Sequence, residues 1–212
     1  PNLSLDGIGT NLGCHNGVSP DPGNMGELSG LADSIESRFG LVLPTVSGGN
    51  SSNLDWVLGG ADPERVNDLR LGESLLLGRE PLHRRPMEGL HTDAITLVAE
   101  VIESGPKPSQ PWGTIARSAF GTTVRPERKG STQQAVLAVG EQDTDCHALI
   151  APHGFEITGA SSDHLVLDCG SSLPPVGAEV RFQLGYSALV RAMTSPFVSQ
   201  VTNVQPSAVA AS

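Results

Sequence analysis

The chain has 212 residues, of which 38% are hydrophobic and only 4% aromatic, so its core must consist mainly of aliphatic side chains. Thirteen basic residues face 23 acidic ones, which gives a formal net charge of -10. This charge argues against a nucleic-acid partner and an anionic membrane surface, because both require basic residues; a single phosphate needs only local amides and a cation.

The cysteines are scattered along the chain and form no CxxC pair: they are Cys14, Cys146 and Cys169. An odd number of widely spaced cysteines indicates a reducing compartment without a disulfide framework. The sequence has neither a membrane-spanning window nor the basic and apolar parts of a signal peptide. We therefore expect a cytoplasmic protein, and the missing initiator methionine leads us to expect that the chain begins partway through a larger one.

Residues 1–85 alternate between strand-like and helix-like segments. In chain order, we expect strands at 3–8, 41–46 and 68–72, a helix at 24–39 and a short helix at 54–58. Strands that alternate with helices pair in parallel through right-handed crossovers. This region therefore predicts an α/β unit whose polar, glycine-rich residues lie at the carboxyl ends of its strands.

The longer helix has sequence signals for its start, its end and its buried face. Asn24 stands three residues before Glu27, an arrangement close to a capping box, and Gly40 follows the last helical residue as a C-terminal cap. The apolar residues at helical spacing are expected to form its buried face, and they are Leu28, Leu31, Ile35 and Phe39.

Residues 86–205 lose the helical period. We expect strands at 95–102, 134–139, 155–158, 164–167 and 179–184, separated by glycine, proline, serine and aspartate. This spacing is typical of a small antiparallel β domain. The proline-bearing stretch 80–86 is expected to link the two regions, and residues 206–212 to form a disordered tail.

Two glycine-rich segments follow predicted strands, at Ser47–Ser51 and at Arg70–Glu73. Glycine lets backbone amides approach an anion closely, and a helix N-terminus adds a favourable dipole. In (β/α)8 barrels, phosphate often binds after the seventh and eighth strands. The segments therefore predict a phosphate site, with two ordinary turns as the alternative.

Arg70 lies between Leu69 and Leu71 at the end of an otherwise apolar strand. If the leucines face the surrounding helices, strand alternation turns Arg70 toward the interior of the barrel. A buried arginine needs an acceptor. That acceptor is either a ligand atom or, in a structural ion pair, the carboxylate of Asp68 or Glu73.

Several segments in a fixed order resemble a known family: Thr10-Asn11-Leu12, Ser47-Gly48-Gly49-Asn50-Ser51, Leu69-Arg70-Leu71-Gly72-Glu73-Ser74 and Ser161-Ser162-Asp163-His164. Together they resemble the later part of pyridoxal-phosphate (PLP) dependent alanine racemases, closest to the ornithine racemase branch, over nearly the whole chain. The resemblance implies a fold that is α/β plus all-β. Residues 1–85 would be the last strand–helix units of a partial (β/α)8 barrel, and residues 86–205 a small β-barrel-like domain.

The same resemblance implies roles around the cofactor PLP. Ser51, with Asn50 beside it, would place its hydroxyl on the cofactor phosphate, and Gly72 and Glu73 would present backbone amides to it. Arg70 would lie against the pyridine nitrogen and keep it unprotonated, which makes the ring a weaker electron sink.

Further roles are implied for the ring and the substrate. Asn11 would pack near the ring, and Ser162, through its backbone amide, and Asp163 would contact the carboxylate of a small amino-acid substrate bound to the partner subunit of a homodimer. For Asp163 and His164, the alternative is a polar turn before the strand at Leu165.

Two departures from the family concern the proton carriers. The only lysines, Lys107 and Lys129, follow no barrel strand and are interpreted as surface charges. The Schiff-base lysine would therefore lie in a missing N-terminal barrel half. Glu141 stands where alanine racemases have a catalytic tyrosine, either as a base or as solvated surface, with Asp163 and His164 as further weak candidates.

We therefore expect the whole protein to racemise an amino acid, as an ornithine- or alanine-racemase-like enzyme. This chain would supply the phosphate cup and the β domain, and alone it would be inactive and poorly stable. The alternatives are a catalytically inactive fragment and a non-catalytic PLP-binding protein, although proteins of that second kind lack a β domain. We expect no metal.

Overall fold

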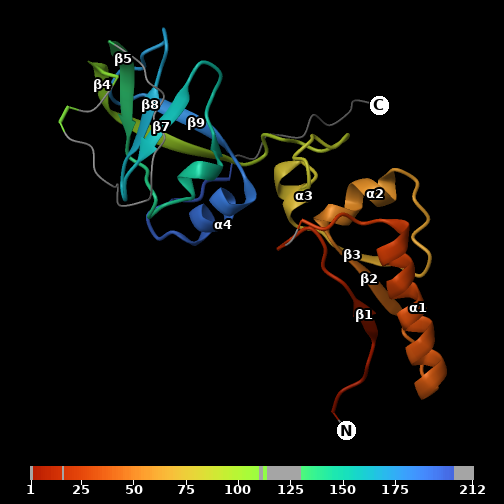
Figure 1. Ribbon diagram of the computed structural model, residues 1–212. Helices are drawn as coiled ribbons and strands as arrows, with labels where there is room; N and C mark the ends of the chain where they lie inside the picture. The colour runs from red at the N-terminus through yellow and green to blue at the C-terminus, as the bar shows by residue number, and fades with distance from the viewer. Residues whose placement is uncertain (1, 16, 110–111, 114–129, 203–212) are drawn as a thin grey trace, which may run out of the picture. The chain divides into compact units, whose positions relative to one another are not determined.

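The computed structural model describes residues 2–15, 17–109, 112–113 and 130–202. Its contacts divide the chain into two compact units, Pro1–Ile95 and Thr96–Ser212 (Figure 1). The first unit is α/β and the second is built mainly of β strands, so this level of the predicted fold class is confirmed. The predicted tail, 206–212, lies outside the described residues.

The first unit contains a three-stranded parallel sheet in the order β1-β2-β3. Its strands are β1 (Gly7–Gly9), β2 (Thr45–Asn50) and β3 (Asp68–Arg70). A Cβ atom on Gly7 would lie 2.2 Å from the carbonyl oxygen of Thr45, so the close pairing of β1 with β2 requires glycine at this position. The predicted parallel pairing is confirmed, although β2 begins and ends later than we expected.

Helix α1 (Pro22–Phe39) follows β1 and has a capping box at its start. The Asp21 carboxylate accepts the Asn24 amide, and the Asn24 side chain accepts the Asp21 amide. Proline fits the first turn because its missing amide has no helical partner there. The predicted end at Gly40, which is left-handed with φ 62°, is confirmed. The predicted start was wrong, because Asp21 is the cap and Asn24 is the third residue of the helix.

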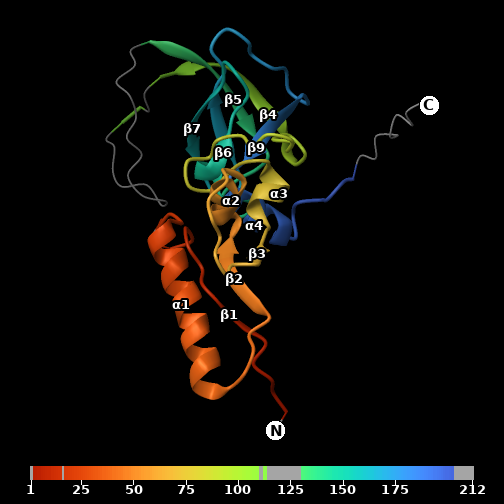
Figure 2. The same ribbon diagram turned by 90° about the vertical axis from the view of Figure 1, so that its right-hand side faces the viewer.

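Helix α1 packs on the sheet in both views (Figure 1 and Figure 2). The core of this unit consists of Met25, Leu28, Ala32, Leu43, Val46 and Val66. Two members of the predicted buried face are instead exposed, Leu31 by 52% and Phe39 by 65%. The helix turns Ser29 and Ala32 inward instead, and such small side chains permit a close approach to the sheet.

An ion-pair cluster also holds α1 to the segment before β3. The Arg65 guanidinium lies 2.5 Å from the carboxylate of Asp33 and 2.8 Å from that of Glu36. The hydrogen bond that the Arg65 guanidinium donates to Glu36 lowers the pKa of the Glu36 carboxyl to about 2. Three short helical elements lie between β2 and the end of the unit: the 3-10 helix η1 (Ser51–Asn53), α2 (Leu54–Leu58), as predicted, and α3 (Glu73–Leu77).

The second unit contains a curled six-stranded sheet in the order β6-β9-β4-β5-β8-β7, in which all the pairs are antiparallel (Figure 1). Its strands are β4 (Thr96–Pro108), β5 (Ser131–Leu137), β6 (Leu149–Ile150), β7 (Glu156–Ala160), β8 (Leu165–Asp168) and β9 (Glu179–Leu184). The predicted antiparallel domain is confirmed. The two-residue strand β6 was not expected.

Strand β4 shows the alternation that builds the core of this unit. Leu97, Ala99 and Val101 are buried, whereas the residues between them are exposed. Phe182 of β9 is fully buried in the same core. Helix α4 (Tyr186–Thr194) adds Ala188, Leu189 and Ala192 to the buried set. Nowhere in the described part of the chain is a helix both long and apolar enough to cross a membrane.

Candidate functional site

The carboxyl ends of β2 and β3 bring the two predicted glycine-rich segments together. Ser51 follows β2 directly, and Gly72 lies between β3 and α3. The buried Ser51 hydroxyl oxygen accepts hydrogen bonds from the Gly72 amide at 3.2 Å, the Ser74 amide at 3.1 Å and the Ser74 hydroxyl at 3.1 Å. The Ser51 hydroxyl and the Gly72 amide are therefore close enough to bind the same small anion.

The donors around Ser51 outnumber what one hydroxyl can satisfy. A serine oxygen has two lone pairs, and here three donors share it. The Glu73 amide, in the first turn of α3, donates to no atom of the described residues. A phosphate group has several acceptor oxygens and would satisfy these donors more fully. The residues at this end of the sheet therefore fit a phosphate group.

Asn50 joins the loop after β1 to the loop after β2. Its side-chain nitrogen donates to the Asn11 side-chain oxygen at 2.8 Å and to the Leu12 carbonyl at 2.7 Å. Its side-chain oxygen accepts the Ser52 amide at 2.8 Å. Asn11 is thereby brought to the site, while the polar atoms of Asn50 are occupied in holding the two loops together.

Arg70 extends its guanidinium across the ends of the neighbouring strands. It donates to the Ser47 hydroxyl and, at 2.8 Å, to the Thr10 carbonyl. Val46 packs in the core beneath α1, and the next residue of a strand points to the opposite face of its sheet. Ser47 and Arg70 therefore share the face that α1 does not cover, and Arg70 is exposed there rather than buried.

The alternative interpretation of Arg70, as part of a structural ion pair, was wrong. Within the described residues, no carboxylate of Asp68 or Glu73 pairs with it, and its hydrogen-bond acceptors are uncharged oxygens. Burial raises the pKa of Glu73, and the cation that counteracts this effect is Arg84. The exposed Arg70 guanidinium thus has no countercharge in this part of the chain.

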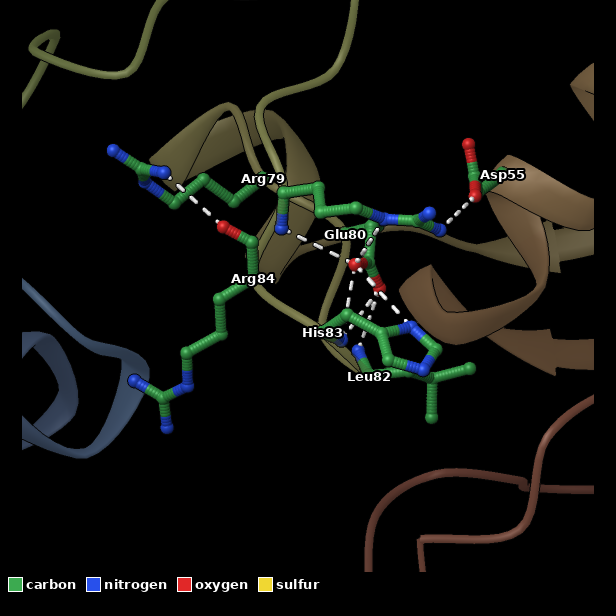
Figure 3. Close-up of polar contacts among 7 residues, drawn as sticks. Asp55, Arg79, Glu80, Leu82, His83 and Arg84 are labelled. Atoms are coloured by element: carbon green, nitrogen blue, oxygen red, sulfur yellow. Dashed lines mark hydrogen bonds and ion pairs between the residues drawn. The ribbon is translucent and has the colours of Figure 1, made fainter.

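Glu80 orders the stretch that follows α3 (Figure 3). Its side chain is only 4% exposed, and its carboxylate accepts the amides of Leu82 at 2.8 Å, His83 at 2.9 Å and Arg85 at 3.2 Å. Burial alone would raise the pKa of Glu80, but these amides and the Arg85 guanidinium outweigh it and lower the pKa. Arg85 also reaches Asp55 of α2 at 3.1 Å. The predicted linker is therefore an ordered turn held to the first unit.

In the second unit, the segment after β5 lies beside the turn between β7 and β8. The Glu141 amide donates to the Ser161 carbonyl and the Gln142 amide to the Ser162 carbonyl, both at 2.9 Å. A Cβ atom on Gly140 would lie 2.4 Å from the backbone nitrogen of Asp163, so the close contact between the two segments requires glycine at this position. The structure therefore brings together the proposed position of the second base and the proposed substrate turn.

The Glu141 carboxylate lies against helix α4. Its side chain is 10% exposed, and one oxygen lies 3.5 Å from the Arg191 guanidinium. The other oxygen lies 3.9 Å from the His147 ring, is buried and has no hydrogen-bond partner in the described chain. The interpretation of Glu141 as solvated surface was therefore wrong.

The Ser161–His164 segment is a polar turn before β8, as one of the two interpretations predicted. One Asp163 oxygen accepts the hydroxyls of Ser161 at 3.2 Å and Ser162 at 3.1 Å, and lies 3.1 Å from the His164 ring nitrogen. The Ser162 hydrogen bond lowers the pKa of Asp163. Among the described residues, the Ser162 amide has no acceptor, so it is available to a ligand.

Other predicted features fall outside these clusters. Lys107 pairs with Glu103 at 2.6 Å near the end of β4, and Lys129 lies outside the described residues. All three cysteines are free, and only Cys14 is exposed. The side chains that the structure describes include no group of histidine, cysteine, aspartate and glutamate that could hold a metal ion.

Four polar residues at these clusters were missed from the sequence: Ser47, Ser74, Asp143 and Arg191. Ser47 and Ser74 belong to segments already singled out, so their position beside the glycines was an available signal. Arg191 lies on α4, which the sequence did not predict. Asp143 is buried by tertiary packing, which no local pattern reveals.

Comparison with known proteins gives two curated relatives and no matching family model. The chain is 41% identical over 202 residues to the ornithine racemase of Acetoanaerobium sticklandii, which covers 94% of this chain and 57% of the relative. It is 40% identical over 200 residues to the lysine racemase of Thermotoga maritima, covering 93% of this chain and 56% of the relative. The chain thus spans little more than half the length of these relatives.

Among solved structures, the chain is similar to the alanine racemase from Bartonella henselae, which was determined with covalently bound pyridoxal phosphate. The TM-score is 0.55 at 18% sequence identity, and the match covers 90% of this chain and 51% of that chain. At this identity, the likeness concerns the fold alone.

Proposed function

The chain belongs to the alanine/ornithine racemase family, and from this premise we propose that it takes part in the PLP-dependent racemisation of an amino acid. The observation that carries the proposal is the convergence of the Ser51 hydroxyl and the Gly72 amide, within 3.2 Å, on the same sheet end as Arg70, whose guanidinium forms no ion pair with any described residue. The names of both relatives favour a basic substrate such as ornithine or lysine.

We assign the cofactor contacts to the first unit. Ser51 and the amides of Gly72 and Glu73 bind the phosphate, and Arg70 faces the pyridine nitrogen and keeps it free of a proton. Asn11 lies near the ring, where Asn50 holds it through the hydrogen bond between their side chains. When bound, the cofactor supplies an electron sink that makes the α-proton of an amino acid easier to remove.

We assign the substrate contacts to the second unit. The Ser162 amide binds the substrate carboxylate, and Asp163 orders the turn that presents this amide. A racemase must remove a proton on one face and return it on the other, which requires two proton carriers. In this chain the candidates for one carrier are Glu141, Asp163 and His164.

The other carrier is proposed to be a lysine from a barrel half that this chain does not include. Residues 1–95 contain no lysine, so this unit cannot hold the cofactor covalently. We therefore propose that this chain alone binds the cofactor without catalysing the reaction, and that the complete enzyme is a homodimer. A non-catalytic PLP-binding chain is the alternative function that the missing lysine favours.

The cofactor proposal is tested with pyridoxine 5′-phosphate, which has no aldehyde and cannot react with Lys107 or Lys129. Fluorescence titration of the 212-residue chain is expected to show saturable binding, which Ser51→Ala weakens about tenfold because an anion loses a hydrogen bond. Ser34→Ala, on the exposed face of α1, is the control and should bind as the parent chain does. Equal binding of unphosphorylated pyridoxine, or no effect of Ser51→Ala, would show that this end of the sheet is not a phosphate site.

A further inference from the structure

The second unit contains a cavity of about 610 Å³ beside the proposed substrate turn. This volume lies within the range of small-molecule sites, roughly 300–1,000 Å³. One part of the wall is apolar and comes from β4, from the residues directly after β5 and from residues 197–199 and 201; it includes Leu97, Val98, Val139 and Phe197. Asp143 and Asp163 belong to the same lining.

Asp143 has a carboxylate oxygen that lacks a hydrogen-bond donor. The residue is only 7% exposed. One oxygen accepts the Gly140 amide at 2.9 Å, whereas the other is buried without a partner in the described chain. Burying an unpaired carboxylate oxygen is costly, and among the described residues the only donor to the Asp143 carboxylate is the Gly140 amide. The cavity lining therefore includes a carboxylate group whose hydrogen-bonding capacity is only partly used.

The charges around the cavity favour a cationic donor. Arg181 also lines the cavity, but its guanidinium lies 3.5 Å from the Glu179 carboxylate. Asp143 and Asp163 therefore leave the lining with a negative balance. An apolar wall that ends at a carboxylate suits a chain of methylene groups with a terminal ammonium, because the stem is buried while the head gains an acceptor.

We propose that this cavity is the specificity pocket for the side chain of a basic amino acid, with Asp143 as the acceptor of its terminal ammonium. The proposal rests on the proposed function, because the Ser162 amide that would bind the substrate carboxylate directly precedes Asp163 in the same turn. It goes further by naming the residue that distinguishes ornithine or lysine from an amino acid with a short apolar side chain.

The test uses three probes of equal chain length and measures amide chemical shifts of the 212-residue chain by NMR. Pentylammonium is expected to shift the amides of Gln142, Asp143 and Asp163 in a saturable way. Pentan-1-ol should bind about tenfold more weakly and pentanoate still less, because a charged donor gains more from a carboxylate than a neutral one. If the alcohol binds as well as the ammonium, or if the shifts fall elsewhere, the pocket has no role in recognising a cation.

Two variants complete the test. Asp143→Asn keeps an acceptor for Gly140 but removes the charge, and should weaken pentylammonium binding about tenfold. Asp93→Asn removes an exposed charge outside the lining and should leave binding unchanged. Unaltered binding by a folded Asp143→Asn chain would overturn the proposal. If that variant does not fold, Asp163→Asn and the comparison of the probes on the parent chain decide the question.

The probes carry no phosphate and bind without a cofactor. If pentylammonium does not bind, the binding of pyridoxine 5′-phosphate at Ser51 is unaffected. If pyridoxine 5′-phosphate does not bind, the response of Asp143 to pentylammonium is likewise unaffected. The two proposals therefore fail separately.

Discussion

Arg70 carries a charge that the described part of the first unit does not neutralise, and this charge should act on any bound pyridine ring. If its guanidinium faces the ring nitrogen, protonation of that nitrogen is disfavoured, so its pKa in the bound ligand is lowered. Arg70→Gln should raise this pKa toward the value of the free ligand, and the change can be followed in the ultraviolet spectrum of bound pyridoxine 5′-phosphate. An unchanged pKa would place the guanidinium away from the ring nitrogen.

Glu80 is a second residue whose replacement should change a measurable property, the free energy of unfolding. Its carboxylate satisfies three backbone amides, so Glu80→Gln should lower the free energy of unfolding by about 1–3 kcal/mol near neutral pH. Because the folded pKa is lowered, this stability is present above the ordinary glutamate pKa of about 4.5 and is lost as the pH falls through the folded value.

Urea denaturation followed by circular dichroism checks both statements about Glu80. The difference between the parent chain and Glu80→Gln should shrink steadily below about pH 4.5. Glu27→Gln, an exposed position on α1, serves as the control. A difference that stays constant through acid pH would mean that the ionised carboxylate is not what stabilises the turn.

Among the elements, α1 depends on its capping box at the N-terminus. Asp21→Ala removes the acceptor for the Asn24 amide and should destabilise the first unit by about 0.5–2 kcal/mol. Ser37→Ala, at an exposed position in the same helix, should leave the denaturation midpoint nearly unchanged. If both variants behave alike, the helix start is held by its packing rather than by the cap.

The elements also show what could be predicted from sequence. The parallel strands, the end of α1 at Gly40 and all of β9 were predicted because glycine signals and apolar alternation are local patterns. Helices α3 and α4 were missed, since α3 directly follows a glycine-rich segment and α4 lies in a region whose other segments have the pattern of strands. The residues that fix Glu141 and Arg70, which are Arg191, Ser47 and Thr10, come from distant segments, so only the folded chain brings them together.

For the whole molecule, the distribution of buried apolar residues predicts unequal stability of the two units. Most of the buried apolar side chains found in the described residues belong to the second unit, including Phe182, Leu137 and Leu165. Amides of β4, β5 and β9 should therefore exchange with solvent deuterium more slowly than those of β1, β2 and β3. Mass spectrometry of peptic fragments measures this; equal protection would mean that the first unit gains stability from contacts outside its own core.

The thiols provide a second measurement on the whole chain. Burial raises the pKa of Cys146 to about 12 and also raises the pKa of Cys169, whereas Cys14 is exposed. In the native chain, Cys14 should therefore react rapidly with a chromogenic disulfide reagent and release one equivalent of chromophore. Cys146 and Cys169 should react only after denaturation. Cys14→Ser should abolish the rapid phase. A rapid phase that persists in this variant would place a second thiol at the surface.

The hydroxyl of Ser51 occupies the centre of a ring of donors, and this has a consequence for the speed of recognition. Because the amides already point at a common oxygen, an incoming anion needs to displace one rotatable hydroxyl and leaves the backbone where it is. Little conformational entropy is then lost at capture. Association should accordingly proceed in a single kinetic phase whose rate rises linearly with ligand concentration, as expected for a binding site that is already formed before the ligand binds.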